Sequence, residues 1–182
     1  PERDRSERRI MSEVDSIVVW SQSERESLTG IYQVPARKTA VIPPGVDSAR
    51  FSPGTQLEAR ANLGLNGDKM VLFVGRLERL KGVDVLLSAM AMMEDPVDAK
   101  LVIVGGAECS PERRILIEHA EQLGISDRVQ FHSSVDQDEL IQYYRAADGC
   151  ALPSYYESFG LAALEASACG TPVVASEVGG LP

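Results

Sequence analysis

The run Met70-Val71-Leu72-Phe73-Val74 is followed directly by Gly75 and Arg76. Consecutive apolar residues that end at a glycine and a charge are typical of a strand buried on both faces of a parallel sheet. Short runs of the same kind recur at residues 16–20, 39–42, 101–104, 129–131, 150–152 and 172–175. The sequence therefore predicts a series of short strands, most of them buried.

Longer amphipathic stretches separate these runs. After the run at 70–74, for example, Val83, Leu86, Leu87 and Met90 recur at the spacing of one helical face. Strands that alternate with helices in this way predict an α/β fold. Its expected form is a Rossmann-like parallel sheet with helices on both faces and right-handed crossovers between the strands.

Residues 43–68 interrupt this alternation with turn sequences at Pro43-Pro44-Gly45 and Phe51-Ser52-Pro53-Gly54, and a short polar helix is expected at 57–63. We interpret residues 1–46 as the end of one α/β domain, 47–66 as an interdomain linker and 67–182 as a second domain. Because a Gly-Gly-Leu-Pro loop directly follows the last strand, the second domain is expected to be truncated, and the chain to be cut at both ends.

Composition excludes several classes of protein. The 182 residues carry a net charge of −9, so no overall basic field attracts nucleic acid, and a phosphate ligand needs local cations or backbone amides. No apolar run approaches the roughly 20 residues of a membrane span, and the charged N-terminus lacks the apolar core of a signal peptide. Cys109, Cys150 and Cys169 are widely spaced, which fits a reducing, cytoplasmic setting and favours neither disulfides nor a zinc cluster.

Two glutamates flank a predicted helix start after the run at 150–152. A loop carries Glu157, the helix is expected to begin near Phe159 or Gly160, and Glu165 follows on the helix. Unpaired amides at such a start form an anion site. Glu165 would lie roughly 7 Å along the axis at about 1.5 Å per residue, the distance from a diphosphate to a ribose. The alternative is an exposed loop glutamate and a partly buried helical glutamate in an ion pair.

A second group of polar residues follows the strand at 70–74. Gly75 ends the strand, Arg76 and Lys81 lie in the loop, and the next helix is expected to start near Gly82. Ligands of open parallel sheets bind at the carboxyl ends of the strands, where both this loop and Glu157 are expected. A guanidinium and an ammonium suit phosphate oxygens. The alternative is a solvated charged loop, which is our interpretation of Arg79.

Other chemistries find less support in the sequence. Gly105-Gly106 is a weaker phosphate-loop candidate, and DxD, HExxH, GxSxG and GxGxxG are all missing. Metal-centred, serine-nucleophile and hydride-transfer mechanisms are therefore not predicted.

Several motifs in order resemble the GT4-type (group 1) retaining glycosyltransferases of the GT-B fold, and the resemblance covers nearly the whole chain. The motifs are Glu157-Ser-Phe-Gly-Leu-Ala-Ala-Leu-Glu165, Val74-Gly75-Arg76-Leu77 with Lys81-Gly82, Ile42-Pro43-Pro44-Gly45-Val46-Asp47, Tyr144-Arg145-Ala146-Ala147-Asp148, residues 168–175 and Gly179-Gly180-Leu181-Pro182. The resemblance implies that residues 1–46 end an N-terminal acceptor-side domain. It also implies that residues 67–182 are a C-terminal, donor-binding domain.

The resemblance also implies a role for each site residue. Arg76 and Lys81, with Gly75 in their loop, would hold a nucleotide diphosphate, and Glu165 would bind its ribose. Glu157 and the amides of Phe159, Gly160 and Leu161 would bind the sugar or the phosphate. Ser133, Ser134 and Val135 would touch the base through their backbone, although many relatives have glycine where Ser133 stands. Arg76, Lys81 and Glu157 would be the catalytic residues.

The implied reaction transfers a sugar from a UDP- or GDP-linked donor with retention of configuration, without a metal or another cofactor. The acceptor is not named by the sequence and could be a sugar, a sugar phosphate, a lipid or a polysaccharide; Ser21-Gln22-Ser23-Glu24 is the acceptor-side candidate. Peripheral membrane contact through the rest of the N-terminal domain is left open. Two alternatives also stay open, a non-catalytic nucleotide-sugar-binding module and a sugar-nucleotide epimerase of the same fold. The chain alone is expected to be inactive in transfer.

Overall fold

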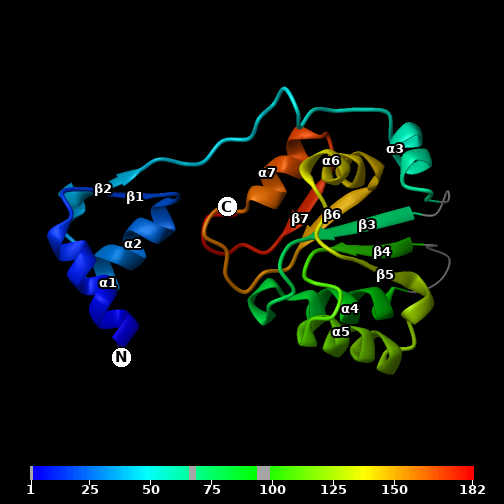
Figure 1. Cartoon of the computed structure of the whole chain (residues 1–182), viewed down its shortest axis with the longest axis horizontal. Helices are drawn as coiled ribbons and strands as arrows, with labels where there is room; N and C mark the ends of the chain where they lie inside the picture. The colour runs from blue at the N-terminus through cyan, green and yellow to red at the C-terminus, as the bar shows by residue number, and fades with distance from the viewer. Residues whose placement is uncertain (1, 66–68, 94–98) are drawn as a thin grey trace. The chain divides into compact units, whose positions relative to one another are not determined.

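The computed structural model of the chain describes residues 2–65, 69–93 and 99–182 (Figure 1). These residues form two compact units. The larger unit contains Val46–Tyr156 and Leu161–Ser176, and the smaller one contains the residues up to Gly45 together with Glu157–Gly160 and Glu177–Pro182. The predicted boundary between residues 66 and 67 lies outside the described residues.

The larger unit is built on a parallel five-stranded sheet. The strands are β3 (Lys69–Val74), β4 (Ala99–Val104), β5 (Val129–His132), β6 (Gly149–Leu152) and β7 (Val173–Ala175). Their order across the sheet is β5-β4-β3-β6-β7. The chain therefore moves outward from β3 to β5 and then crosses back to the other side of β3. The predicted Rossmann-like α/β class is confirmed.

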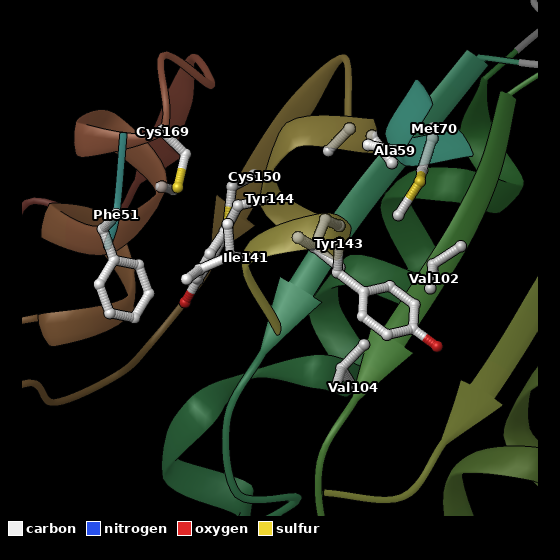
Figure 2. Packing of buried hydrophobic residues seen from close by; sticks show 14 of the residues in the cluster. Phe51, Ala59, Met70, Val102, Val104, Ile141, Tyr143, Tyr144, Cys150 and Cys169 are labelled. Carbon is white, nitrogen blue, oxygen red and sulfur yellow. The ribbon is translucent and has the colours of Figure 1, made fainter. Parts of the chain in front are cut away.

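Helices cover both faces of this sheet (Figure 1). The helices are α3 (Gln56–Asn62), α4 (Val83–Met92), α5 (Pro111–Gln122), α6 (Gln137–Ala146) and α7 (Leu161–Ala168), with short 3-10 turns η2 (Arg79–Lys81) and η3 (Ser126–Arg128). Alternate residues of β3 enter two separate cores. Leu72 packs with residues of α3, α6 and α7, whereas Phe73 packs with α4 and α5. Figure 2 shows the first of these cores.

The interval predicted to be a linker contributes to that first core. Phe51 is 4% exposed and Ala59, on α3, is 1% exposed. Arg60 of α3 also forms a 2.6 Å ion pair with Asp148, just before β6. The part of the interval from Phe51 to α3 is thus packed onto the larger unit.

Two loops meet at the carboxyl ends of β3 and β6, where the direction of the chain across the sheet reverses. The amide of Tyr155 donates a 2.9 Å hydrogen bond to the carbonyl of Leu80. Gly82 is buried with φ 67°, and a Cβ at this position would overlap the Pro153 carbonyl oxygen. Only glycine combines this backbone conformation with so close an approach. The two loops are therefore fixed to one another.

The smaller unit consists of α1 (Glu2–Glu13), β1 (Ile17–Val19), α2 (Gln22–Ile31), the turn η1 (Ala36–Lys38) and β2 (Thr39–Val41). β1 and β2 pair in parallel, with Ile17 opposite Thr39. The segments around Glu157 and Gly180 also group with this unit, whereas the sequence places them in the second domain. The Gly180 amide donates a 3.0 Å hydrogen bond to the Glu157 carbonyl, which joins the two segments. Within the described ranges, no helix is long and apolar enough to cross a membrane.

Candidate functional site

A pocket of about 250 Å³ lies at the carboxyl ends of β3, β4 and β5. Gly75 and Arg76 line it from the loop after β3, and Ser134 and Val135 line it from the loop after β5. Gly105-Gly106, the weaker candidate in the sequence, completes the floor after β4. Three loops that are far apart in the sequence thus meet in one pocket, as the parallel topology requires.

Arg76 at the rim of the pocket forms an ion pair within its own loop. Its Nη1 lies 2.6 Å from Glu78 Oε1, and the two side chains are 75% and 46% exposed. Such an exposed pair is weak, so a phosphate can compete for the guanidinium. Lys81 ends the turn η2 and is half-buried. Arg79, in the same turn, is exposed, which agrees with its interpretation as a solvated residue.

The loop after β5 is held by Arg113, which the sequence analysis did not single out. Arg113, on α5, donates to the Phe131 carbonyl at 2.8 Å and to the Ser133 hydroxyl at 3.2 Å. The amide of Ser134 donates to the Gly106 carbonyl at 3.1 Å. The Ser133 side chain is therefore engaged with the protein, and the loop presents Ser134 and Val135 to the pocket.

The helix after Glu157 begins at Leu161, one or two residues later than predicted. Gly160 has φ 92°, a left-handed conformation that keeps it outside the helix. The amides at the start of α7 are thus those from Leu161 onward, with Phe159 and Gly160 in the preceding loop. Leu161 and Glu165 belong to the larger unit, and Glu157, Phe159 and Gly160 belong to the smaller one.

Glu165 lies one turn into α7, where it accepts a 2.8 Å hydrogen bond from the Tyr144 hydroxyl. Burial raises the pKa of the Glu165 carboxyl, and the hydrogen bond from Tyr144 opposes that rise. No ion pair of Glu165 is formed within the part of the chain that the structure describes. The ion pair considered as an alternative for the helical glutamate is therefore not present there.

The acceptor-side candidate, Ser21 to Glu24, caps a helix. The Ser21 hydroxyl accepts the Glu24 amide at 3.2 Å, and the Glu24 carboxylate accepts the Trp20 amide at 2.7 Å. These bonds satisfy one amide in the first turn of α2 and one amide just before its N-cap. The side chains of Ser21 and Glu24 therefore stabilise the start of the helix and the residue before it.

Comparison with known proteins reveals the family. The family model for Glycosyl transferases group 1 matches residues 55–182, and the model for Glycosyltransferase Family 4 matches residues 1–50. The chain is similar to curated D-inositol 3-phosphate glycosyltransferases. It is 44% identical to that of Mycolicibacterium vanbaalenii over 100% of this chain and 42% of the relative. It is 47% identical to that of Actinosynnema mirum over 97% of this chain and 44% of the relative.

Solved structures share the fold. Sucrose-phosphate synthase from Thermosynechococcus elongatus is 39% identical with a TM-score of 0.86, over 99% of this chain and 45% of that chain. The Anabaena protein HepE, solved in complex with UDP-glucose, is 26% identical with a TM-score of 0.87, over 97% of this chain and 49% of that chain. The chain therefore spans less than half the length of each of these four proteins.

The parallel sheet, covered by helices and carrying a pocket at the carboxyl ends of its strands, is that of the GT-B glycosyltransferases. The chain belongs to the group 1 glycosyl transferases. The family that the sequence motifs resemble is thus confirmed.

Proposed function

We propose that this chain supplies the donor-binding part of a retaining glycosyltransferase that uses a nucleotide-diphosphate sugar. The observation that carries the proposal is the pocket in which Gly75, Arg76, Ser134 and Val135 converge at the carboxyl ends of three parallel strands. Such a crevice is where open α/β sheets bind nucleotides. UDP is the proposed nucleotide, because the related HepE was solved with UDP and with UDP-glucose.

Within this proposal, each polar group has a defined role. Arg76 and Lys81 bind the diphosphate, Ser134 and Val135 face the base, and Arg113 holds their loop through Ser133. Glu165 accepts hydrogen bonds from the ribose hydroxyls. The amide of Leu161, at the start of α7, adds positive polarisation near the phosphate.

Glu157, Phe159 and Gly160 are proposed to bind the sugar or the phosphate from the loop before α7. The Glu157 carbonyl accepts the Gly180 amide, so the backbone of this loop is fixed by the segment that follows β7. A fixed loop can present a carboxylate and amides to a ligand without reorganising.

The chemistry proposed for the site is stabilisation of the departing diphosphate by cations and amides. Charge on the phosphate grows in the transition state, so donors already in place lower the barrier. Among the described residues, no group of three or more His, Cys, Asp or Glu side chains gathers as a metal site would require. Because cations and amides of the protein would meet the diphosphate, we propose that transfer needs no bound metal. Retention of configuration is proposed because the sequence motifs resemble those of retaining members of the family.

The proposed acceptor is a phosphorylated polyol or sugar. The curated relatives that are 43–47% identical are named for D-inositol 3-phosphate, and the similar synthase from Thermosynechococcus elongatus is named for sucrose phosphate. The acceptor would be held by residues of the acceptor-side domain, of which the described N-terminal residues form only a small unit.

Titration calorimetry of the chain with UDP, UDP-glucose and uridine tests the donor part of this proposal. We expect UDP and UDP-glucose to bind at high micromolar to millimolar levels, because the pocket is open and water screens each charge contact. Uridine should bind far more weakly, since it lacks the diphosphate. Equal affinities for UDP and uridine would contradict the roles of Arg76 and Lys81, and no binding of any nucleotide would overturn the proposal.

A further inference from the structure

Tyr144, on α6, is held rigidly inside the larger unit. It is 0% exposed, and its ring lies 6.3 Å from that of Phe51, centroid to centroid. Its carbonyl accepts a 2.6 Å hydrogen bond from the Thr171 hydroxyl, which ties α6 to the segment before β7. Figure 2 shows the ring beside Cys150 and facing Phe51. The position of the phenolic oxygen is therefore set by packing on several sides.

The phenol of Tyr144 acts on a single partner among the described residues, the Oε2 atom of Glu165 at 2.8 Å. Burial and the neighbouring Glu165 carboxylate raise the pKa of Tyr144, so the hydroxyl stays protonated and remains a donor. A donor fixed on one carboxylate oxygen restricts rotation of the Glu165 side chain. It also favours the ionised form of a carboxylate that burial would otherwise tend to neutralise.

We propose that Tyr144 is a positioning residue for donor binding: its hydroxyl orients the Glu165 carboxylate so that Oε1 can accept hydrogen bonds from the ribose hydroxyls of the nucleotide. This inference rests on the proposed function, in which Glu165 binds the ribose. A binding side chain that a second residue already holds in place loses less conformational freedom when the nucleotide binds, which strengthens the complex. Tyr144 itself touches no ligand in this arrangement.

The next residue in the chain provides a matched control. Tyr143 is also buried, at 3% exposure, and its hydroxyl lies 3.1 Å from His132 Nδ1. Its ring extends from α6 toward β4, beside Val102 and Val104, whereas Tyr144 extends toward Phe51 (Figure 2). Replacing either tyrosine with phenylalanine removes one buried hydroxyl from the same helix. Only Tyr144→Phe removes the partner of Glu165.

The test compares UDP with 2′,3′-dideoxy-UDP, which lacks the ribose hydroxyls, by calorimetry on the chain. In the unaltered chain, UDP should bind more tightly than the dideoxy analogue. Tyr144→Phe should weaken UDP binding by about fivefold to tenfold, which is within the range of a typical net hydrogen bond, and leave the affinity for the dideoxy analogue unchanged. Tyr143→Phe should change neither affinity. In a Glu165→Ala background, which has no side-chain acceptor for Tyr144 or for the ribose, Tyr144→Phe should have no further effect.

The pH dependence gives a second readout that a purely structural role would not move. UDP affinity should fall as the pH drops through the pKa of Glu165, because the protonated carboxyl accepts hydrogen bonds less well. Tyr144→Phe removes the bond that opposes the rise in this pKa, so the fall should begin at a higher pH. Among the described residues, the thiols of Cys150 and Cys169 are the other titratable groups that interact with the Glu165 carboxylate. Burial raises the pKa of both thiols, and Arg145 opposes the rise only for Cys169, so neither should titrate in the acidic range.

The outcomes separate this inference from the proposed function. If the unaltered chain bound no nucleotide, the proposed function and the inference would both be overturned. If UDP bound but Tyr144→Phe weakened UDP and the dideoxy analogue equally, Tyr144 would be a packing residue only. If a variant fails to fold, a measurement on the unaltered chain still tests the inference. In the unaltered chain, the carboxyl carbon NMR signal of Glu165 should shift with UDP and not with the dideoxy analogue, and an unmoved signal would overturn the inference.

Discussion

The guanidinium of Arg76 lies at the rim of the proposed nucleotide pocket and already has a partner in Glu78, two residues along the chain. Both side chains are largely in water, so the pair contributes little to stability. The same carboxylate nevertheless lowers the positive potential that a diphosphate would meet. Glu78 is therefore expected to tune donor affinity without taking part in the chemistry.

Replacing this carboxylate tests that expectation. Glu78→Gln should raise the affinity for UDP by up to about threefold, because Arg76 no longer leaves an ion pair in order to bind phosphate. Calorimetry measures the change, and raising the salt concentration should reduce it. A weaker affinity for UDP would mean that Glu78 helps to present Arg76 rather than competing for it.

The cations themselves are tested by truncation. Arg76→Ala or Lys81→Ala should each weaken UDP binding by about 1.5–3 kcal/mol, the range of hydrogen bonds to charged groups. Arg79→Ala is the control, because Arg79 is an exposed cation in the same turn and is expected to be solvated. Unchanged affinity in both of the first two variants would remove this loop from the site.

At the scale of the elements, Asp148 joins α3, β3 and the start of β6. Its carboxylate accepts the Met70 amide at 2.7 Å and pairs with Arg60 at 2.6 Å and with Lys69 at 3.3 Å. Burial alone would raise the pKa of Asp148, but the Met70 amide and the two cations outweigh it and hold this pKa below its ordinary value. The pair with Arg60 fastens the short helix α3 to the sheet.

Asp148 should therefore stabilise the fold in a pH-dependent way. A depressed pKa in the folded state contributes stability above the unfolded pKa, and this stability is lost as the pH falls through the folded pKa. Asp148→Asn should lower the free energy of unfolding by about 1–3 kcal/mol near neutral pH, and by less under acidic conditions. Urea unfolding across the pH range measures this difference.

The control for Asp148 lies on the preceding helix. Asp138, on α6, pairs with Arg50 at 2.7 Å, but its side chain is 85% exposed. Asp138→Asn should have little effect at any pH. Equal effects of the two variants on the free energy of unfolding would show that the Arg60–Asp148 ion pair stabilises the fold no more than an exposed pair does.

The sequence predicted the strands and the class of fold because buried parallel strands leave apolar runs that end at glycine or charge, as at Val74 and Gly75. It also placed Gly75 and Arg76 at the carboxyl ends of the strands, and the family resemblance assigned Ser134 and Val135 to the same nucleotide; the structure brings these four residues into one pocket. The predicted start of α7 was one or two residues too close to the N-terminus, because the neighbouring residues do not reveal the left-handed conformation of Gly160.

The contacts of Tyr144 and Arg113 could not be predicted in the same way. Tyr144 entered the sequence analysis only as part of a family motif, and its bond to Glu165 depends on how α6 and α7 pack together. The bond from Arg113 to Ser133 likewise depends on the packing of α5 beside β5. Periodicity identifies the buried face of a helix and does not reveal which polar atoms meet across two faces.

At the scale of the whole molecule, the chain spans less than half the length of its curated relatives. Turnover requires donor and acceptor to be held together, which supplies much of the rate advantage. We therefore predict that the chain alone binds UDP and transfers no sugar to D-inositol 3-phosphate. If mass spectrometry showed that the chain alone transfers glucose from UDP-glucose to this acceptor, the prediction would be contradicted.

Metal independence is a further property predicted for the whole site. UDP affinity of the chain should survive excess EDTA, because cations of the protein, rather than a bound ion, meet the diphosphate. The test is calorimetry before and after chelation. A loss of binding that magnesium or manganese restored would mean that the phosphate-binding role has been assigned to the wrong groups.

A nucleotide diphosphate is proposed to bind at the carboxyl ends of the parallel strands, and backbone amide NMR tests this most directly. Titration of the chain with UDP should shift the signals of residues 75–82 and 157–165, with smaller changes at residues 133–135. GDP and ADP should shift the diphosphate-binding residues in the same way and differ at the base-binding loop. Shifts confined to loops at the opposite ends of the strands, with residues 75–82 and 157–165 unmoved, would contradict the account.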